Sequence, residues 1–302
     1  GRTIFSYLGP GVPPLLPEMH FLKAPEAHLF ENKMFHACNY LQGNEGNLDP
    51  GHLSFLHDFS CAAGDPTSGS EFQQFEAAMS ADATPKIDVQ DTRYGMRICS
   101  ARSSSDGRSY VRITNYLFPN AGIFAGVELK YGPRGYSVHW HVPIDDERHW
   151  KFEFFYHPDH PFDKEDLRSK IAAEMTSDYR PIRSHANRYL QDRAEMTNST
   201  FAGLGTYFPA QDIFAVESQG AIQDRTRENL ATSDIVIARA RRIMLDAISG
   251  LEEGNDPPFV LRKDADNTFD DLLVLTASIE PDEDPFAHCA SIAEAGNYHA
   301  MT

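Results

Sequence analysis

Cysteine is scarce in this chain of 302 residues, which contains only four. Cys38, Cys61, Cys99 and Cys289 are scattered, and none belongs to a C-x-x-C or C-x-H pair. Such spacing makes neither a disulfide framework nor the cysteine motif of a structural zinc or iron–sulfur site. We interpret all four as buried or chemically indifferent thiols.

Positive charge is also in short supply, with 27 Lys and Arg against 44 Asp and Glu and a net charge of −17. That balance argues against a nucleic-acid partner and against adsorption to anionic membranes. No apolar run reaches the ~20 residues of a membrane helix, and residues 1–5 do not resemble a signal peptide. Because 41% of the residues are hydrophobic, the chain can bury a full core. We expect a cytoplasmic protein dominated by one large domain.

Strand and helix patterns divide the chain near residue 160. Turn signals separate six stretches that predict an antiparallel meander: 87–90, 94–99, 110–118, 123–129, 136–142 and 150–156. Helical periodicity follows at 163–175 and 234–251, the latter with an apolar stripe. We also expect a strand at 3–9, a proline-rich linker at 10–17, helical structure around 26–60 and a surface loop or lid at 62–85.

Two histidines five residues apart, His52 and His57, follow Asp49-Pro50, a pair typical of a helix start. Two imidazoles and one carboxylate form the ligand set of non-haem Fe(II) that activates O₂. On an ideal helix the two histidines point ~140° apart, so we expect a wider, π-like turn between them. Two ordinary histidines remain an alternative on spacing alone.

A third ligand is available in the C-terminal half. Asp212 follows Tyr207-Phe208-Pro209, which indicates the start of a helix entering a core. A carboxylate facing inward there needs a cation to balance it. A helix-capping role is the alternative for this residue.

The run 38–57, CNYLQGNEGNLDPGHLSFLH, resembles the iron-binding motif of the Rieske non-haem iron aromatic-ring oxygenases. The phthalate and phenoxybenzoate dioxygenase group is the most similar. Residues 209–245 resemble that group in the same order, with Gln-Asp, Glu-x-Gln-Gly, Asp-Arg-Thr-x-Glu, Leu-x-x-Ser-Asp and Arg-Arg. The similarity runs from about residue 1 to residue 250, and two separated motifs in order make it more specific than either alone.

The resemblance implies an α+β, helix-grip (START/Bet v1-like) domain, in which a curved antiparallel sheet surrounds a long helix. His52, His57 and Asp212 would bind one mononuclear Fe(II). Asp49 would bridge it to the Rieske [2Fe–2S] cluster of a neighbouring subunit, in a homotrimer. The implied reaction is O₂-dependent ring hydroxylation, mono- or dioxygenation, or O-dealkylation of an aromatic acid. Electrons would come from an NAD(P)H-dependent reductase or ferredoxin.

The cluster's own ligands, a C-x-H and a later C-x-x-H, do not occur in this chain. We therefore expect residues 1–17 to be the end of a Rieske domain and its linker, and 18–302 to be the catalytic iron domain. Two alternatives stay open: a cupin-like metal site on His139 and His141, or a non-catalytic helix-grip ligand carrier.

Some nearby residues have roles that the sequence leaves open. Asn39 and Glu45 lie close to the iron motif and serve either its support or helix capping and packing. Three further histidines are expected to be solvated near turns: His149, His157 and His160.

Overall fold

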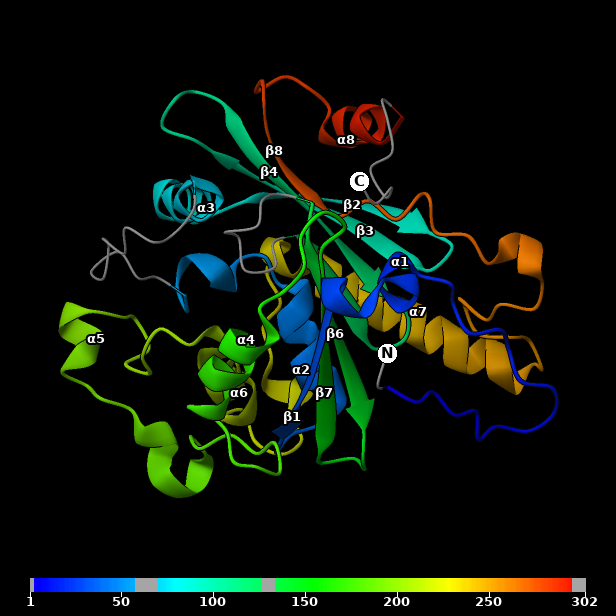
Figure 1. The fold of residues 1–302 in the computed structure, drawn as a ribbon, viewed down its shortest axis with the longest axis horizontal. Coiled ribbons are helices and arrows are strands. Elements are labelled where there is room, and N and C mark those ends of the chain that lie inside the picture. Colours follow the sequence, from blue (N-terminus) through cyan, green and yellow to red (C-terminus); the bar gives the residue numbers. More distant parts are fainter. Residues whose placement is uncertain (1–2, 58–69, 126–133, 295–302) are drawn as a thin grey trace.

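A computed structural model describes residues 3–57, 70–125 and 134–294. Its centre is one antiparallel sheet in the order β1-β7-β6-β5-β4-β3-β2, with β8 also paired to β4 (Figure 1). The strands are β1 (Leu29–His36), β2 (Lys86–Thr92), β3 (Gly95–Ser103), β4 (Ser109–Leu117), β5 (Ala121–Ala125), β6 (Tyr136–Pro143), β7 (His149–Tyr156) and β8 (Leu275–Ile279). β4 pairs with β8 through Ser109–Ile113 and with β5 through Asn115–Leu117. β8 and β5 thus lie one after the other along the same edge of β4.

Helices surround this sheet on both faces (Figure 1). The α-helices are α1 (His20–Lys23), α2 (Tyr40–Leu48), α3 (Ser70–Ala81), α4 (Lys164–Ala172), α5 (Glu195–Asn198), α6 (Phe208–Glu217), α7 (Ile235–Glu252) and α8 (Pro285–Glu294). Short 3₁₀ helices occur at η1 (Glu26–His28), η2 (His52–Ser54), η5 (His185–Leu190), η6 (Arg225–Arg227), η7 (Thr232–Asp234) and η8 (Asp264–Asp266). α2 contacts β5, β6 and β7, and α7 contacts β3.

The two faces of the sheet differ in chemistry. Successive strand residues point to opposite faces, and the face away from α2 carries Ile123, Val138 and Phe154 in one apolar cluster with α1 and residues 261–274. The face covered by α2, which we call the α2 face, carries polar side chains where β6 and β7 pair, such as His139 opposite Glu153. Burial of apolar side chains therefore stabilises the face away from α2, whereas the α2 face accommodates polar groups.

The α+β class and the helix-grip arrangement expected from the sequence are confirmed. A strand is present at each of the six stretches of the expected meander, although residues 126–129 of the fourth lie outside the described residues. The expected helix at 163–175 contains α4, and the one at 234–251 covers α7 except for its last residue. Three expectations were wrong: residues 3–9 form no strand, 29–36 form β1 rather than helix, and 70–81 form α3 rather than loop. The rest of the expected lid, up to residue 69, lies outside the described residues.

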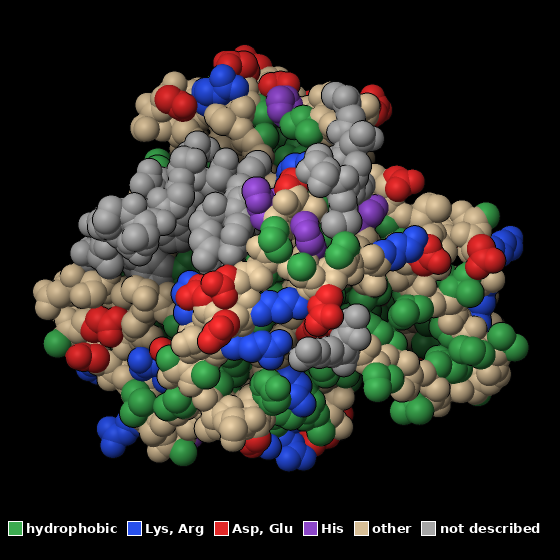
Figure 2. Space-filling view, in the orientation of Figure 1, with side chains coloured by type: hydrophobic (Ala, Val, Ile, Leu, Met, Phe, Trp, Pro, Cys, Tyr) green, Lys and Arg blue, Asp and Glu red, His purple; other side chains and the backbone are tan. Residues whose placement is uncertain are grey.

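Exposed apolar side chains gather where the N-terminal segment and α7 lie, on the right of the space-filling view (Figure 2). They include Leu8, Val12, Leu245 and Leu251. Among the described residues, no helix combines the length and apolar character needed to span a membrane.

Candidate metal centre

The His52–His57 segment begins where α2 ends. Asn39 caps the start of α2, because its side-chain oxygen accepts a hydrogen bond from the Leu41 amide at 2.9 Å. Asp49 is the C-cap of that helix, not the start of a new one as the Asp-Pro pair predicted. Its carboxylate then turns the chain, accepting hydrogen bonds from the amides of Gly51 (2.7 Å) and His52 (3.3 Å).

The turn between the two histidines is a 3₁₀ helix rather than the expected π-like bulge. η2 starts at His52, whose carbonyl accepts from the amides of Phe55 and Leu56. Beyond it, irregular turns bring the His57 ring to 5.2 Å from the His52 ring, centroid to centroid. Because the chain is not α-helical between His52 and His57, the two rings can lie close together despite their spacing of five residues.

Asp212 comes from α6 on the other side of the site. Pro209 stands in the first turn of α6, where its missing amide hydrogen costs nothing. Phe208, the first residue of the helix, lies against the His57 ring with centroids 4.5 Å apart. The expectation of a helix that starts here and enters the core is confirmed, and Asp212 is not a helix cap.

The three side chains converge. Asp212 Oδ1 lies 3.0 Å from His57 Nε2 and 3.8 Å from His52 Nε2. Two atoms each about 2.1 Å from one ion are about 3.0 Å apart at 90° and about 3.6 Å apart at 120°. Within the part of the chain that the structure describes, this is the one group of His, Cys, Asp or Glu whose ligand atoms gather closely enough for a metal ion. The donor set and its spacing fit Fe(II).

Both imidazoles present the same nitrogen to the centre. His52 Nδ1 lies 2.6 Å from the Asp49 carbonyl oxygen, and His57 Nδ1 lies 2.7 Å from the side-chain oxygen of Gln211. Each Nε2 is left to face Asp212. Such partners on the far ring nitrogen are the usual way in which proteins orient metal-binding histidines.

Charge is balanced tightly within the group. Burial alone would raise the pKa of Asp212, but His57 and His52 hold it well below the usual range. Burial would lower the pKa of His52, yet Asp49 and Asp212 offset this and raise it. An inward carboxylate between two imidazoles thus needs a cation, either a proton or a metal ion.

Asp49 lies beside this group without entering it. Its carboxylate oxygen is 3.7 Å from His52 Nδ1, and its side chain is 28% exposed. Burial tends to raise the pKa of Asp49, but the hydrogen bonds to His52 and Gly51 hold it below its ordinary value. It is therefore an anion at neutral pH, in contact with both a candidate ligand and solvent.

Polar side chains of the α2 face lie near the group. Lys151 and Glu153 form a buried ion pair at 2.9 Å, and Asn32 donates to Glu153 at 2.9 Å. His139 lies 3.8 Å from Glu153 through Nε2 and 3.3 Å from the Asn47 oxygen through Nδ1. Burial and the charge of Lys151 lower the pKa of His139 to about 4. The carboxylates of Glu153 and Asp212 partly offset this shift, so the charge on Asp212 affects His139. Polar residues at alternate positions of β7 are the sequence signal for this face: His149, Lys151 and Glu153.

His139 and His141 share the α2 face, as alternation predicted, but they do not converge on one ion. His141 Nδ1 is 2.9 Å from His149 Nε2, and His149 Nδ1 is 2.8 Å from the Cys38 carbonyl. His36 stacks on His149 with ring centroids 4.6 Å apart. His149 is fully buried and His157 is buried, so the expectation that they are solvated was wrong; His160 is exposed.

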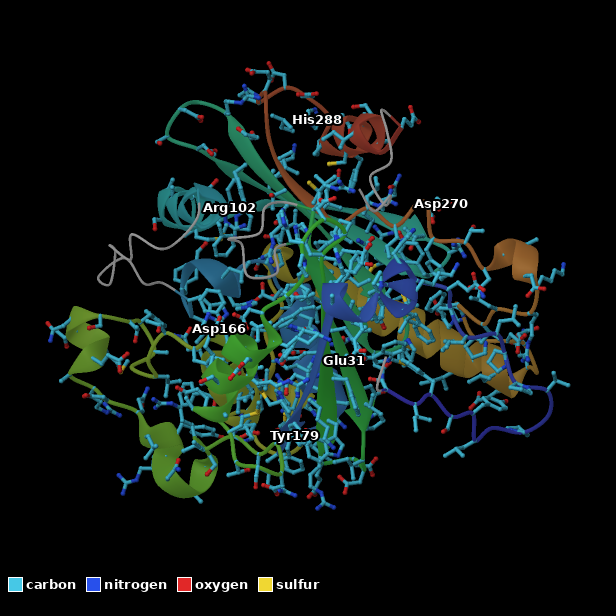
Figure 3. The ribbon with its side chains drawn as sticks, viewed as in Figure 1. Glu31, Arg102, Asp166, Tyr179, Asp270 and His288 are labelled. Carbon is cyan, nitrogen blue, oxygen red and sulfur yellow. The ribbon has the colours of Figure 1, made fainter. Side chains whose placement is uncertain are left out.

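On the α2 face, Arg102 is buried and Arg112 is half-buried, and neither has a carboxylate bonded to it among the described residues. Arg102, labelled beside α3 in Figure 3, donates to the carbonyls of Asp82 and Pro50, and so ties α3 to the His52 turn. Arg112 on β4 donates to the Ala125 carbonyl at 3.1 Å and lies over the Phe75 ring at 5.4 Å. Its Nε has no hydrogen-bond partner. Burial lowers the pKa of Arg112, and its guanidinium in turn lowers that of His139.

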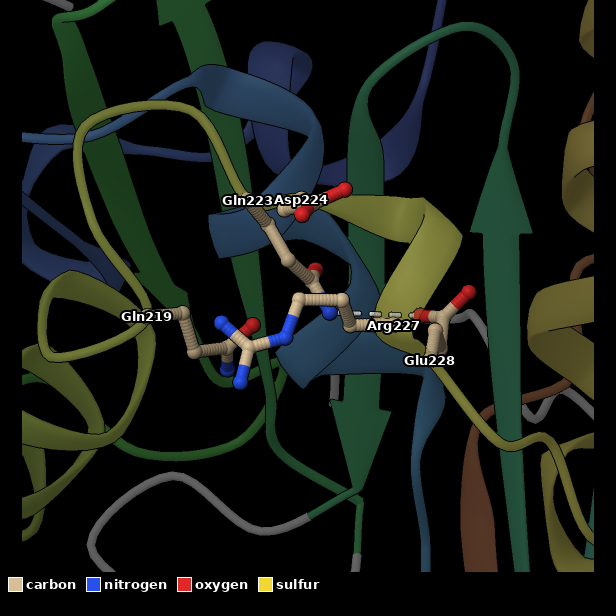
Figure 4. Close-up of a pocket in the computed structure, with 5 residues that line it drawn as sticks. All are labelled: Gln219, Gln223, Asp224, Arg227 and Glu228. Atoms are coloured by element: carbon tan, nitrogen blue, oxygen red, sulfur yellow. Dashed lines mark hydrogen bonds between the residues drawn. The ribbon is translucent and has the colours of Figure 1, made fainter.

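Glu45 does not support the metal group directly. It accepts hydrogen bonds from Arg241 at 2.7 and 2.9 Å and from Arg225 at 2.9 and 3.1 Å, which ties α2 to α7 and η6. Asn39 and Glu45 thus have the capping and packing roles that the sequence left open. A polar surface hollow of about 300 Å³ lies beside this clamp (Figure 4). Its lining shares no residue with the triad and has no apolar side chain: Gln219, Gln223, Asp224, Arg227 and Glu228.

Comparisons with known proteins agree on one family. The family model described as "LigXa C-terminal domain like" matches residues 6–296. The phthalate 4,5-dioxygenase oxygenase subunit of Pseudomonas putida is 31% identical over 84% of this chain and 58% of its own length. The phenoxybenzoate dioxygenase subunit alpha of Ectopseudomonas oleovorans is 27% identical, over 87% of this chain and 59% of its own length.

A third relative is named as an O-demethylase. The 5,5'-dehydrodivanillate O-demethylase oxygenase subunit of a Sphingobium strain is 26% identical over 88% of this chain and 55% of its own length. The chain thus spans a little over half the length of the curated relatives that it matches. Among solved structures, dicamba monooxygenase bound to dicamba covers 80% of this chain and 64% of its own, with 11% identity and a TM-score of 0.44.

Proposed function

Since this chain belongs to the LigXa C-terminal domain-like family, we propose that it is the catalytic domain of a Rieske-type non-haem iron oxygenase. The oxygenase resemblance expected from the sequence is confirmed by its curated relatives. The observation that carries the proposal is the convergence of His52, His57 and Asp212 from two separate segments. We propose that these three hold one Fe(II), and that residues 18–302 make up this catalytic domain.

Bound Fe(II) would supply O₂ activation, because two imidazoles and one carboxylate leave adjacent coordination positions open. The protein's own residues orient the ligands and adjust charge around them. The Asp49 carbonyl and the Gln211 amide direct the two imidazoles, while Lys151 lowers the pKa of Asp212 from the sheet side. Phe208 covers one side of the His57 ring and shields it from water.

Arg112 supports an aromatic acid as the substrate class. A guanidinium stays charged at any physiological pH, and burying it without an anion is costly. Among the described residues, Arg112 donates one hydrogen bond and lies over an aromatic ring, and it is near enough to His139 to shift the pKa of that histidine. We propose that a substrate carboxylate supplies the missing anion. The reaction is then oxygenation of the ring, or O-dealkylation, of that acid.

Electrons must come from outside this chain, because it lacks the cysteine and histidine motifs of a Rieske cluster. We propose a [2Fe–2S] Rieske domain of the longer protein, with residues 1–17 at its junction, in a homotrimer supplied by an NAD(P)H-dependent reductase or ferredoxin. Asp49 would bridge cluster and iron. The described cysteines, Cys38, Cys99 and Cys289, are free, which fits the reducing cytoplasm.

Anaerobic titration with Fe(II), with X-ray absorption at the iron edge, tests the metal site. The wild-type chain should bind one iron with nitrogen and oxygen ligands, and Asp212→Ala should lose it. His141→Ala is the matched control, because a cupin-like site would need that ring. Iron that survives Asp212→Ala but not His141→Ala would refute the assignment. No iron binding at all would favour the non-catalytic carrier.

Ligand binding tests the substrate class separately. Benzoate and phthalate should bind about 10- to 100-fold more weakly to Arg112→Met, the range expected for lost charged hydrogen bonds. The neutral analogue benzamide should be affected little. Arg108→Met, which removes a partly exposed arginine that lies just before β4 and pairs with Glu280, is the control. Equal losses for charged and neutral ligands would contradict a carboxylate-binding role.

Asp49→Asn tests the proposed bridge. The variant should bind iron and ligand as the wild type does, because Asp49 is not in the triad. Turnover with the complete electron-transfer system should fall at least 10-fold. Full turnover in this variant would exclude Asp49 from the electron path.

A further inference from the structure

Gln211 lies immediately before Asp212 in α6 and has no exposed surface. Its side chain makes two hydrogen bonds, one at each end of the amide. The nitrogen donates to the Gly205 carbonyl at 2.6 Å, and the oxygen lies 2.7 Å from His57 Nδ1. A buried glutamine thus connects a loop carbonyl to a candidate metal ligand.

The Gly205 carbonyl fixes which way this amide points. A carbonyl oxygen can only accept a hydrogen bond, so it must face the NH₂ end of Gln211. The carbonyl itself is held, because the Gly205 amide donates to Glu195 at 2.8 Å and Gly205 has a φ of +71°. That left-handed backbone conformation favours glycine. Rotating the Gln211 amide would therefore place two acceptors together at Gly205.

The fixed amide in turn sets the proton on His57. The Gln211 oxygen has only lone pairs, so His57 Nδ1 must carry a hydrogen to bond it. A neutral imidazole then has its lone pair on Nε2, 3.0 Å from Asp212 Oδ1. Without Gln211, the opposite arrangement would be favoured, with an Nε2 hydrogen donated to the Asp212 carboxylate. That hydrogen would occupy the direction in which a metal binds.

We propose that Gln211 is a positioning residue that holds His57 in the Nδ1–H tautomer and so keeps Nε2 free for metal. The inference deepens the proposed iron site and rests on it for its purpose. The tautomer, however, is a property of the metal-free chain. His52 needs no such residue, because the backbone carbonyl of Asp49 does the same for its Nδ1. The site is therefore asymmetric, and one of its two imidazoles depends on a replaceable side chain.

Two-bond ¹H–¹⁵N correlation spectra of the metal-free chain at pH 9 test the tautomer directly, because protonated and lone-pair ring nitrogens are well resolved. His57→Gln assigns the signals. The wild type should show His57 as Nδ1–H. Gln211→Met keeps the length but removes the acceptor, and it should shift the ratio of Nε2–H to Nδ1–H at least 10-fold. Gln211→Glu loses the hydrogen bond to the Gly205 carbonyl and should lower stability, but it keeps an acceptor for His57 Nδ1 and should retain the wild-type tautomer.

Gln42→Met is the matched control. Gln42 is also a buried glutamine, and its amide donates to the carbonyls of Val216 and Gly220 without touching a histidine. This variant should lose stability but keep the His57 tautomer. If Gln211→Met does not fold, Gln211→Asn withdraws the acceptor by one methylene and should give the same shift. A wild-type Nε2–H tautomer, or an unchanged tautomer in folded Gln211→Met, overturns the proposal.

Anaerobic Fe(II) titration gives the second readout. Loss of a residue that orients a ligand histidine costs about 10- to 100-fold in metal affinity. We expect that loss in Gln211→Met, with affinity retained in Gln42→Met and largely restored in Gln211→Glu. Wild-type chain that binds no iron refutes the proposed function and leaves the tautomer result standing. Iron binding by a wild type whose His57 is Nε2–H refutes the role of Gln211 alone.

Discussion

Gly43 in α2 has no room for a side chain. A Cβ atom there would lie 2.6 Å from His141 Nδ1 and 2.7 Å from His149 Nε2. Neither ring can swing aside, because the two imidazoles bond each other and His149 is also held by the Cys38 carbonyl. Gly43→Ala must therefore push α2 away from the sheet by about 0.8 Å, if the contact is to relax to an ordinary 3.4 Å.

The expected cost follows from three opposing terms. Overpacking a buried site costs about 1–3 kcal/mol. Weakening the imidazole–imidazole hydrogen bond costs about 1 kcal/mol. Replacing a glycine in the middle of a helix by alanine stabilises the helix by about 1 kcal/mol. We expect Gly43→Ala to lower the free energy of unfolding by about 2 kcal/mol.

Gly46 provides the control three residues along the same helix. A Cβ atom there would lie 3.5 Å from Val216 Cγ1, an ordinary contact. Gly46→Ala should therefore gain up to about 1 kcal/mol of stability, so the two variants should differ by about 3 kcal/mol in urea denaturation. Because α2 leads into the His52 turn, Gly43→Ala should also weaken Fe(II) binding. Equal stability of the two variants would refute the steric argument.

Three further outcomes follow from the same contacts. Glu45→Gln leaves Arg241 and Arg225 with Glu228 as their remaining carboxylate and should cost about 1–3 kcal/mol, whereas the exposed-pair control Asp246→Asn should change urea stability by less than about 0.5 kcal/mol. Burial lowers the pKa of His149 to about 4, below about 6.5 when unfolded, so its ring has no effect above pH 6.5. Stability falls by up to about 3 kcal/mol as the pH drops from 6.5 to 4, and His149→Asn should flatten that part of the profile. Gly205 has a φ of +71°, so Gly205→Ala should lower the free energy of unfolding by about 1 kcal/mol. It should also weaken Fe(II) binding, and an unchanged iron affinity would show that the Gly205 loop does not support the metal site.

The metal group could be proposed from the sequence because its chemistry is local and rare. A histidine pair behind Asp49, with a later inward aspartate, limits the ligand set before any fold is known. The conformation between the histidines could not be foreseen in the same way. A π-like bulge and a 3₁₀ turn can both bring together two side chains that are five residues apart. The 3₁₀ turn forms here because Pro50 and the Asp49 carboxylate end α2 at Leu48.

β1 was missed for a physical reason. Strand patterns are recognised when one face is apolar and the other polar. On β1 the α2 face carries Asn32 and His36, which meet the polar groups of β7, while the opposite face carries Lys33 and Phe35 against Trp150. Neither face is uniformly apolar, so the alternation is lost. α3 was missed because its sequence is short of large apolar residues, and its helical state depends on packing against β3 and η2.

The same polar face explains how this fold can accommodate the candidate metal centre. In a sheet with two apolar faces, an inward carboxylate and three buried histidines would be too costly to bury. Here Asp212 faces two imidazoles, Glu153 faces Lys151, and His141 bonds His149, so nearly every charge has a partner. Arg102 and Arg112 are the exceptions, because neither guanidinium is bonded to a carboxylate of the described residues. Of these two, Arg112 has a single backbone carbonyl as hydrogen-bond partner among the described residues, which fits the proposed ligand with a negative charge of its own.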